Sequence, residues 1–367
     1  MKYFLLLLLL LISPVFASQN CNEALFYFEG RELYINNLSH SDKAEGFNNV
    51  ETFINPLQDR LNPNVDAYFN FEYSTEVIRT SFNFEELIPS CAVDTKDVFA
   101  LCVKVSPDGE NWSKWFMIGF WGLGISDFKI KYIEEDKFAK LKTDYISLKE
   151  PVSYFQLRIL AMTDSIKIRS LSAAISSEKT DKNLQLARNS CFMNKYCGIA
   201  LDVPFRSQAW EDKKISGHIC SPVSIGMIMD YFGVNIKSKE LSEKVYDIPT
   251  DMYGIWWRSV QAAAGYGFDG YVRYFRSYDE VGEYILQGIP IAACVCFGEN
   301  ELSGSATEES EGHVLVLSGF DSKGNPICRD GAWKTAKEGI VIYGREEFKN
   351  AWFNRGGGVG YVIFPHI

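Results

Sequence analysis

The periodicity of the chain changes once, between residues 176 and 197, and this limits the fold to two unlike halves. From about residue 22 to 176, short runs such as 155–160 alternate apolar and polar residues, and turn sequences such as Pro107-Asp108-Gly109 separate them. Such runs are typical of half-buried antiparallel strands. The sequence therefore predicts an all-β sandwich at 22–176, a polar linker at 177–196 and an α+β domain at 197–367. Because the strands of the first half carry their own alternation, we expect residues 22–176 to fold alone.

The second half has helical spacing first and strand-like runs afterwards. Pro222 suits the first turn of the first helix, and Gly233 ends it. Ser277 and Glu280 form a capping box for a later helix. The predicted helices span 220–232, 239–246 and 278–287, and the predicted strands span 291–296, 313–319, 326–329, 340–343 and 360–364.

Residues 1–17 indicate in which cellular compartment the protein functions. Lys2 is followed by an unbroken apolar run, which Ser13-Pro14 ends before small residues at the cleavage offsets. This is the anatomy of a secretory signal peptide, and the run is short of the roughly 20 residues that a spanning helix needs. We therefore expect an exported protein with no transmembrane segment in the mature chain.

Nine cysteines would then lie in an oxidising compartment. Because nine is odd, at least one thiol stays free or bonds another molecule. Cys191 with Cys197 is one candidate disulfide, and Cys91 with Cys102 is a second. Cys220 falls in neither pair.

Charge and histidine content exclude several classes of function. The net charge of −10 gives no basic surface for nucleic acid. Only four histidines occur, which argues against a multi-histidine metal site. The spelling Gly265-x-Gly267-x-x-Gly270 follows a helical run and precedes a strand, the reverse of the order in a dinucleotide site. The sequence thus predicts neither a metal nor a cofactor.

Three residues of the second half could perform nucleophilic catalysis. Cys220 begins a helix, where the helix dipole favours the thiolate. His313 begins a predicted strand, and Asp330 ends the next strand after a Gly324-Asn325 turn. Because adjacent antiparallel strands would place His313 and Asp330 side by side, the order Cys, His, Asp is compatible with a nucleophile, a base and an orienting acid. The alternative is a small buried cysteine and a surface histidine.

Two further segments have open interpretations. The acidic run 299–311, just before His313, is either a solvated loop or a mobile flap over a cleft. The tryptophans of residues 106–115, SPDGENWSKW, are either a structural pair or a platform for a sugar. His218 is too near Cys220 along the backbone for an easy base, and we expect a local or substrate-facing role.

The second half also resembles a known family in three stretches. They are Leu201–Gln208 (LDVPFRSQ), Cys220–Gly233 (CSPVSIGMIMDYFG) and Gly312–Asp321 (GHVLVLSGFD). Together they resemble the bacteriocin-processing, double-glycine type of papain-like cysteine peptidase, and more closely its stand-alone exported branch. The resemblance covers roughly residues 200–367 and not the first half. It implies a papain-like peptidase domain.

The resemblance implies a role for each of four residues. Cys220 would be the nucleophile, His313 the general base and acid, and Asp330 the orienting acid. Gln208 would supply the oxyanion-hole donor together with the Cys220 backbone N–H. This sequence departs from the family at Ser221, where glycine is general, and after Asp330, where proline is more common than Gly331.

These observations predict an exported cysteine peptidase that hydrolyses peptide or isopeptide bonds. One alternative keeps the same three residues for cell-wall peptides or for acyl transfer. Another is a binding protein with an inactive papain-like domain. The expected partner is a peptide or protein substrate, with a glycan or protein ligand as an option for the N-terminal domain.

Overall fold

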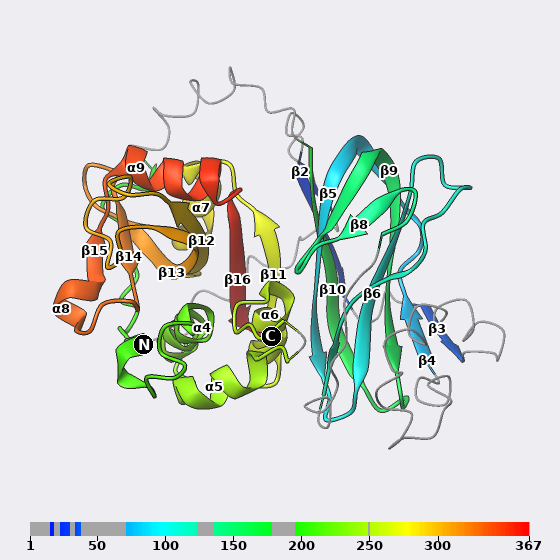
Figure 1. Cartoon of the computed structure of the whole chain (residues 1–367), viewed down its shortest axis with the longest axis horizontal. Helices are drawn as coiled ribbons and strands as arrows, with labels where there is room; N and C mark the ends of the chain where they lie inside the picture. The colour runs from blue at the N-terminus through cyan, green and yellow to red at the C-terminus, as the bar shows by residue number, and fades with distance from the viewer. Residues whose placement is uncertain are drawn as a thin grey trace. The chain divides into compact units, whose positions relative to one another are not determined.

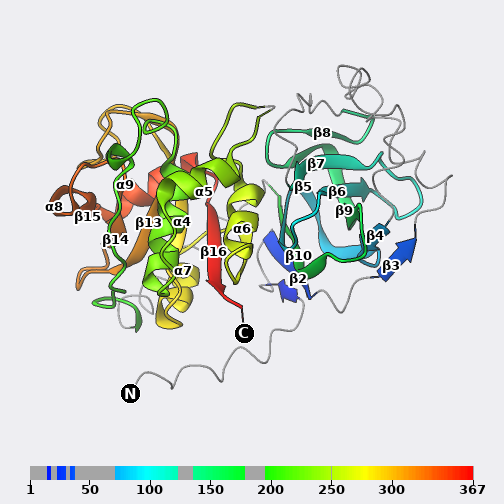
Figure 2. The same cartoon turned by 90° about the horizontal axis from the view of Figure 1, so that it is seen from below.

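The computed structural model describes residues 15–17, 23–29, 34–37, 71–122, 135–177, 195–248 and 250–366. It divides into two compact units (Figures 1 and 2). Of the described residues, the β-rich unit comprises those between 15 and 177 and those of segment 247–261, and the α/β unit comprises those from 195 to 246 and from 262 to 366. Most of the predicted signal sequence and linker, and Cys191, lie outside the described residues.

The β-rich unit contains one antiparallel sheet of ten strands, in the order β1-β2-β10-β5-β9-β4-β3, with β6 paired to β9 and β7, and β8 to β9. The predicted antiparallel β architecture of this half is confirmed. The strands are β1 (Val15–Ala17), β2 (Glu23–Glu29), β3 (Tyr34–Asn37), β4 (Phe71–Ser74), β5 (Ile78–Asp94), β6 (Phe99–Ser106), β7 (Phe116–Trp121), β8 (Ala139–Leu141), β9 (Ile146–Ala161) and β10 (Lys167–Ser176).

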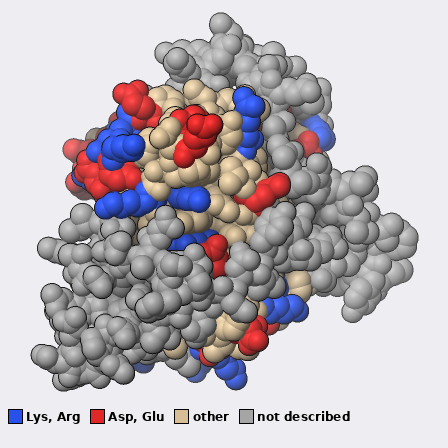
Figure 3. Space-filling model, turned by 90° about the vertical axis from the view of Figure 1, so that its right-hand side faces the viewer, with Lys and Arg blue, Asp and Glu red and all other residues tan. Residues whose placement is uncertain are grey.

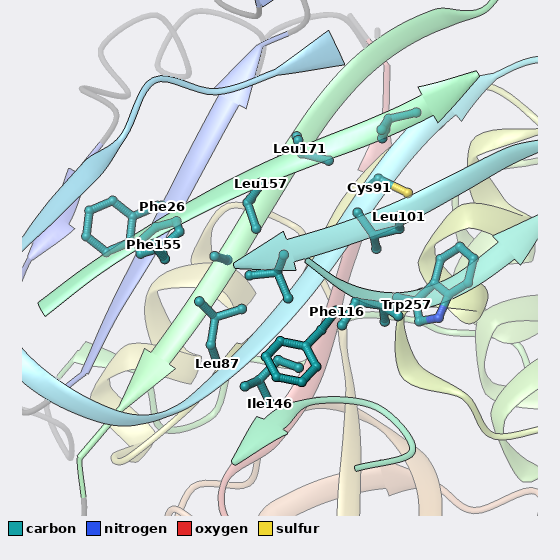
Figure 4. Close-up of a cluster of buried hydrophobic side chains, with 14 of the residues drawn as sticks. Phe26, Leu87, Cys91, Leu101, Phe116, Ile146, Phe155, Leu157, Leu171 and Trp257 are labelled. Atoms are coloured by element: carbon teal, nitrogen blue, oxygen red, sulfur yellow. The ribbon is translucent and has the colours of Figure 1, made fainter. Parts of the chain in front are cut away.

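Long strands let this sheet enclose its own core. The first half of β5 pairs with β9, and its second half, from Glu86 to Asp94, pairs with β10. Side chains from β2 and from β4 to β10 form one buried cluster, part of which is shown in Figure 4. On the face seen in Figure 3, the visible Lys and Arg side chains alternate with Asp and Glu, as expected for a solvated surface.

The tryptophan pair of this unit has cations on its ring faces. The Lys104 ammonium lies 4.5 Å from the ring centroid of Trp112 and 4.8 Å from that of Trp115. The Arg158 guanidinium lies 4.0 Å from the Trp115 centroid. Cation–π packing of this kind favours the structural interpretation of the pair over a sugar platform.

A segment from the second half of the chain completes the core of the β-rich unit. Ile255 and Trp257 belong to the same buried cluster, where Figure 4 shows the Trp257 indole. Gln261 accepts a hydrogen bond from Val93 N (2.9 Å) and donates one to Val93 O (2.7 Å). This division differs from a single boundary within residues 177–196. Residues 22–176 alone lack part of this core.

The α/β unit contains a six-stranded antiparallel sheet in the order β11-β16-β12-β13-β14-β15. The predicted helices and strands of this half are present within a few residues. The strands are β11 (Phe268–Tyr274), β12 (Ile291–Phe297), β13 (Ser310–Phe320), β14 (Pro326–Arg329), β15 (Ile340–Ile342) and β16 (Val359–Pro365). The helical elements of this unit are η5 (Gln208–Trp210), α4 (Cys220–Tyr231), α5 (Ser238–Val245), α7 (Tyr278–Leu286), α8 (Ala336–Gly339), α9 (Arg345–Lys349) and η6 (Asn350–Arg355). Helix α6 (Trp256–Ala264) is shared, because its residues 256–261 belong to the β-rich unit. Since α6 ends before Gly265 and β11 begins at Phe268, the glycine-rich spelling is a helix-to-strand turn, as expected.

Helix α4 packs against β13 and β12 and is almost wholly buried. Ser224 Oγ donates to Val314 O on β13 (3.0 Å). The Arg206 guanidinium lies across Gly226, where a Cβ atom would come within 2.5 Å of it, and pairs with Asp230 through two hydrogen bonds of 2.6 and 2.7 Å. A helix-interior glycine thus makes room for an arginine that ties the preceding segment to α4.

The candidate disulfide between Cys91 and Cys102 is wrong. Both residues are buried thiols. Cys91 on β5 lies opposite Leu171 of β10, whereas Cys102 on β6 lies opposite Arg158 of β9. The two cysteines therefore have different neighbouring strands. Burial raises the pKa of both, that of Cys102 to about 11.

Within the described ranges, no helix has the length and apolar character needed to cross a membrane.

Replacing Trp257 tests the completed core. Because the indole is 1% exposed and packs edge-on against Phe99 and Trp121, we expect Trp257→Ala to lower the free energy of unfolding of the β-rich unit by about 3–5 kcal/mol. Val77→Ala, at a 48% exposed site of the same unit, should change it by less than about 0.5 kcal/mol. Urea unfolding of the full chain measures both, and equal effects would contradict the assignment of residues 247–261 to this core.

The ionisation of Asp144 should make the free energy of unfolding of the same region depend on pH. Burial raises the pKa of Asp144 to about 7, although its Oδ1 accepts a 2.7 Å hydrogen bond from Trp256 N, and Asp247 raises it further. Between about pH 4, the unfolded value, and pH 7, the folded state therefore binds the extra proton, so the free energy of unfolding falls as the pH rises. We expect Asp144→Asn to reduce this slope in urea titrations. An unchanged slope would show that Asp144 ionises normally in the fold.

Candidate active site

Cys220 is the first residue of α4, and its position favours the thiolate. The preceding residue, Ile219, provides no side-chain cap, and the first turn has no acidic residue. Burial opposes ionisation of the thiol. A hydrogen bond and the charge of His313, with the backbone N–H groups of Val314 and Ser221, outweigh it and lower the pKa of Cys220. The positive end of the helix dipole acts in the same direction.

His313 lies on β13, the strand against which α4 packs. Its Nε2 atom is 2.8 Å from Asp330 Oδ1, which leaves Nδ1 as the ring nitrogen for Cys220. Burial alone would lower the pKa of His313. The charge of Asp330 and the hydrogen bonds to Asp330 and Cys220 raise it to about 10. The surroundings therefore favour an imidazolium between a thiolate and a carboxylate.

Strand pairing brings Asp330 to His313. Strand β14 pairs antiparallel with β13, with Arg329 opposite Val316. Asp330 is the next residue after β14, so it continues toward Leu315, and His313 is the diagonal neighbour on the same face. The predicted hairpin thus sets these two side chains beside each other.

The Asp330 carboxylate is 1% exposed and has three hydrogen-bond partners. Oδ1 accepts from His313 and from Ala332 N (3.0 Å), and Oδ2 accepts from the Tyr343 hydroxyl (2.7 Å). Burial would raise the pKa of Asp330, but His313, Tyr343 and Ala332 lower it overall. Asp330 therefore stays ionised despite its burial.

Gln208 is tied to the residues on either side of this group. Its backbone N–H donates to Gly331 O (2.8 Å), directly after Asp330. Its side-chain Nε2 donates to Ser216 O (2.9 Å), in the loop that leads to Cys220. Gln208 Oε1 is buried and has no hydrogen-bond partner among the described residues. One hydrogen of the side-chain amide, which carries two, is thus used by the loop.

The acidic run before His313 is anchored at its start. Leu302 is buried, Glu301 pairs with Arg355 (2.5 Å), and Ser303 donates through N and Oγ to Glu347 (2.9 and 3.0 Å). These contacts favour a fixed solvated loop over a mobile flap.

His218 is exposed, and its backbone N–H donates to Ile215 O (2.8 Å). Its place beside the loop agrees with a local role.

Sequence reasoning missed Tyr343. The run 340–343 is a predicted strand, and β15 pairs with β14 with Ile340 opposite Arg329. Pairing of these two strands was a signal that some residue of the run lies near Asp330. The contact between the Tyr343 hydroxyl and Oδ2 had no sequence pattern of its own.

Across the parts of the chain described above, no three His, Cys, Asp or Glu side chains group closely enough to hold a metal ion.

Comparison with known proteins finds one family model that matches the second half of the chain. Residues 200–359 match the model of the Peptidase_C39 like family. No curated protein matches the sequence significantly.

Three solved structures have partial similarity to the chain. A putative C39-like peptidase from Bacillus anthracis is 18% identical, over 46% of this chain and 98% of that one, with a TM-score of 0.35. A double-glycine-motif protease from an AMS/PCAT transporter, solved with its leader peptide, is 18% identical over 45% and 94%, with a TM-score of 0.30. The peptidase domain of Streptococcus ComA is 17% identical over 41% and 93%, with a TM-score of 0.31. On the family match, the second half of the chain has the fold of the C39-like peptidases, as its sequence motifs predicted.

Proposed function

We propose that this protein is a cysteine peptidase that cleaves peptide or isopeptide bonds with Cys220, His313 and Asp330. The observation that carries the proposal is the unbroken series of hydrogen bonds from thiol to imidazole to buried carboxylate. Each group has its pKa shifted toward the ionised form. Such shifts are typical of catalytic groups.

The mechanism follows from these contacts. The Cys220 thiolate attacks the carbonyl carbon of the scissile bond, and a C–S bond forms. The Cys220 backbone N–H and the Gln208 amide stabilise the negative oxygen. The His313 imidazolium gives its proton to the leaving nitrogen, the C–N bond breaks, and an acyl-enzyme remains. His313 then removes a proton from water as the water oxygen bonds to the acyl carbon, the C–S bond breaks, and the acid and the thiolate are released. Asp330 orients the ring and keeps its own charge.

Two alternatives keep the same site. Acyl transfer differs from hydrolysis only in whether an amine or water attacks the acyl-enzyme. A cell-wall peptide differs only in the substrate. An inactive binding domain has less support, because all four proposed residues are present and three are directly connected.

We also propose that the protein is exported, on the character of residues 1–17. Because Lys104 and Arg158 cover the ring faces of Trp112 and Trp115, a protein ligand for the N-terminal half has more support than a glycan stacked on those rings.

The charge state of the site predicts its reactivity with iodoacetamide. Because the pKa of Cys220 is lowered and that of His313 is raised to about 10, the thiolate–imidazolium pair persists between these values. The two apparent pKa values belong to the pair. At about pH 6, we expect Cys220 to react far faster than a thiol with the ordinary pKa of about 8.5. Quantitative peptide mapping at a series of pH values measures this.

Cys102 is an internal control in the same digest, since burial raises its pKa to about 11 and should slow its labelling. His313→Ala should return Cys220 to ordinary thiol behaviour. Labelling of Cys220 that follows an unperturbed thiol in the parent, and is unchanged in His313→Ala, would refute the activation.

Two variants test hydrolysis directly. Cleavage of a synthetic peptide library, read by mass spectrometry, should disappear in Cys220→Ala. Gln208→Ala should lower kcat by about 10²–10³-fold, as loss of one oxyanion donor does, while iodoacetamide labelling of Cys220 is kept. Equal cleavage by Cys220→Ala and parent would end the proposal. Loss of labelling in Gln208→Ala would make Gln208 structural, through its bonds to Gly331 and Ser216.

A further inference from the structure

The two carboxylate oxygens of Asp330 accept hydrogen bonds from different groups. Oδ1 takes the His313 ring and the Ala332 N–H, whereas the Tyr343 hydroxyl is the hydrogen-bond donor on Oδ2. A carboxylate side chain rotates over a broad, two-fold torsion unless something holds it. The contact on Oδ2 is therefore the one able to fix the plane of the carboxylate while Oδ1 serves the ring.

Tyr343 is itself rigidly placed. It follows β15, its backbone N–H donates to Pro326 O (3.1 Å), and its ring stacks on Phe348 with the centroids 5.6 Å apart. The residue is 0% exposed. Burial, together with the charge of Asp330, raises the pKa of Tyr343 far above its usual range, so the hydroxyl stays protonated at every working pH.

We propose that Tyr343 is a positioning residue for the reaction, which acts by holding the Asp330 carboxylate in the plane that serves His313. This rests on the proposed function. The Tyr343 hydroxyl touches neither the substrate nor the thiol in this scheme. Its effect reaches Cys220 only through Asp330 and then His313.

If Tyr343 acts through Asp330, its removal has a measurable effect that a general loss of stability does not reproduce. If Tyr343 acts through Asp330, removing its hydroxyl matters only while Asp330 is present. A general loosening of the fold would instead slow the reaction equally with or without Asp330. A double-mutant cycle separates the two.

The experiment measures the rate of Cys220 alkylation by iodoacetamide at about pH 6 in the full chain. Tyr343→Phe keeps the ring and removes only the hydroxyl, and we expect a loss of about 10-fold or more, as for a hydrogen bond to a charged group. In the Asp330→Ala background, the same change should alter the rate by less than about 2-fold.

The matched control is Tyr278→Phe. That hydroxyl is also buried in the α/β unit but donates to Arg345 O (2.8 Å). It should alter the alkylation rate by less than about 2-fold in both backgrounds. Equal losses for Tyr343→Phe in the two backgrounds, or a loss no larger than that of the control, would overturn the proposal.

Asp330→Asn keeps the idea testable if Tyr343→Phe does not fold. A tyrosine hydroxyl can also accept, so the asparagine Nδ2 can donate to it while Oδ1 still faces His313. We expect Asp330→Asn to be alkylated at least about 10-fold faster than Asp330→Ala. Equal rates would overturn the positioning role.

Alkylation needs no substrate, so the two proposals fail separately. Absence of peptide cleavage with an intact coupling between Tyr343 and Asp330 would refute the proposed peptidase activity alone. Cleavage by the parent with additive effects of the two variants would refute the positioning role alone.

Discussion

A buried carboxylate imposes the arrangement of the candidate site. Asp330 is almost without solvent, and an ionised group there is costly unless charge and hydrogen bonds replace the lost water. His313 supplies the opposite charge, and Ala332 and Tyr343 supply the remaining donors. The charge of Asp330 and its hydrogen bond raise the pKa of His313 against the effect of burial, and the imidazolium beside Cys220 lowers the pKa of that thiol. The buried charge of Asp330 thus determines the charge of His313 and, through His313, that of Cys220.

Local signals made much of this predictable. Pro222 and Gly233 bound a helix that starts at Cys220, and the Gly324-Asn325 turn joins the strands of His313 and Asp330. Such features depend on neighbours in sequence, which propensity and turn chemistry describe well. The family match over residues 200–359 agrees with the resemblance those motifs suggested.

Contacts between residues far apart in the chain could not be predicted from the sequence. Tyr343 contacts Asp330 from the position directly after β15, which no sequence pattern indicated, and Trp257 lies in a helix whose spacing does not reveal that it fills the β core. The Cys91 and Cys102 pairing failed for the same reason, because spacing along the chain did not reveal which strands are neighbours. Gln208 came from the resemblance alone, and its bonds to Gly331 and Ser216 had no local signal.

The segment 247–261 has a consequence for the order of events during synthesis. The strands from β2 to β10 leave the ribosome well before Ile255 and Trp257, which fill part of their core. Domains generally fold as units during synthesis, the N-terminal one first. Here α4 and α5 of the other unit are made before the residues that fill this apolar site. The nascent chain therefore passes through a stage in which the strands of the first unit are complete and part of their core is not yet made.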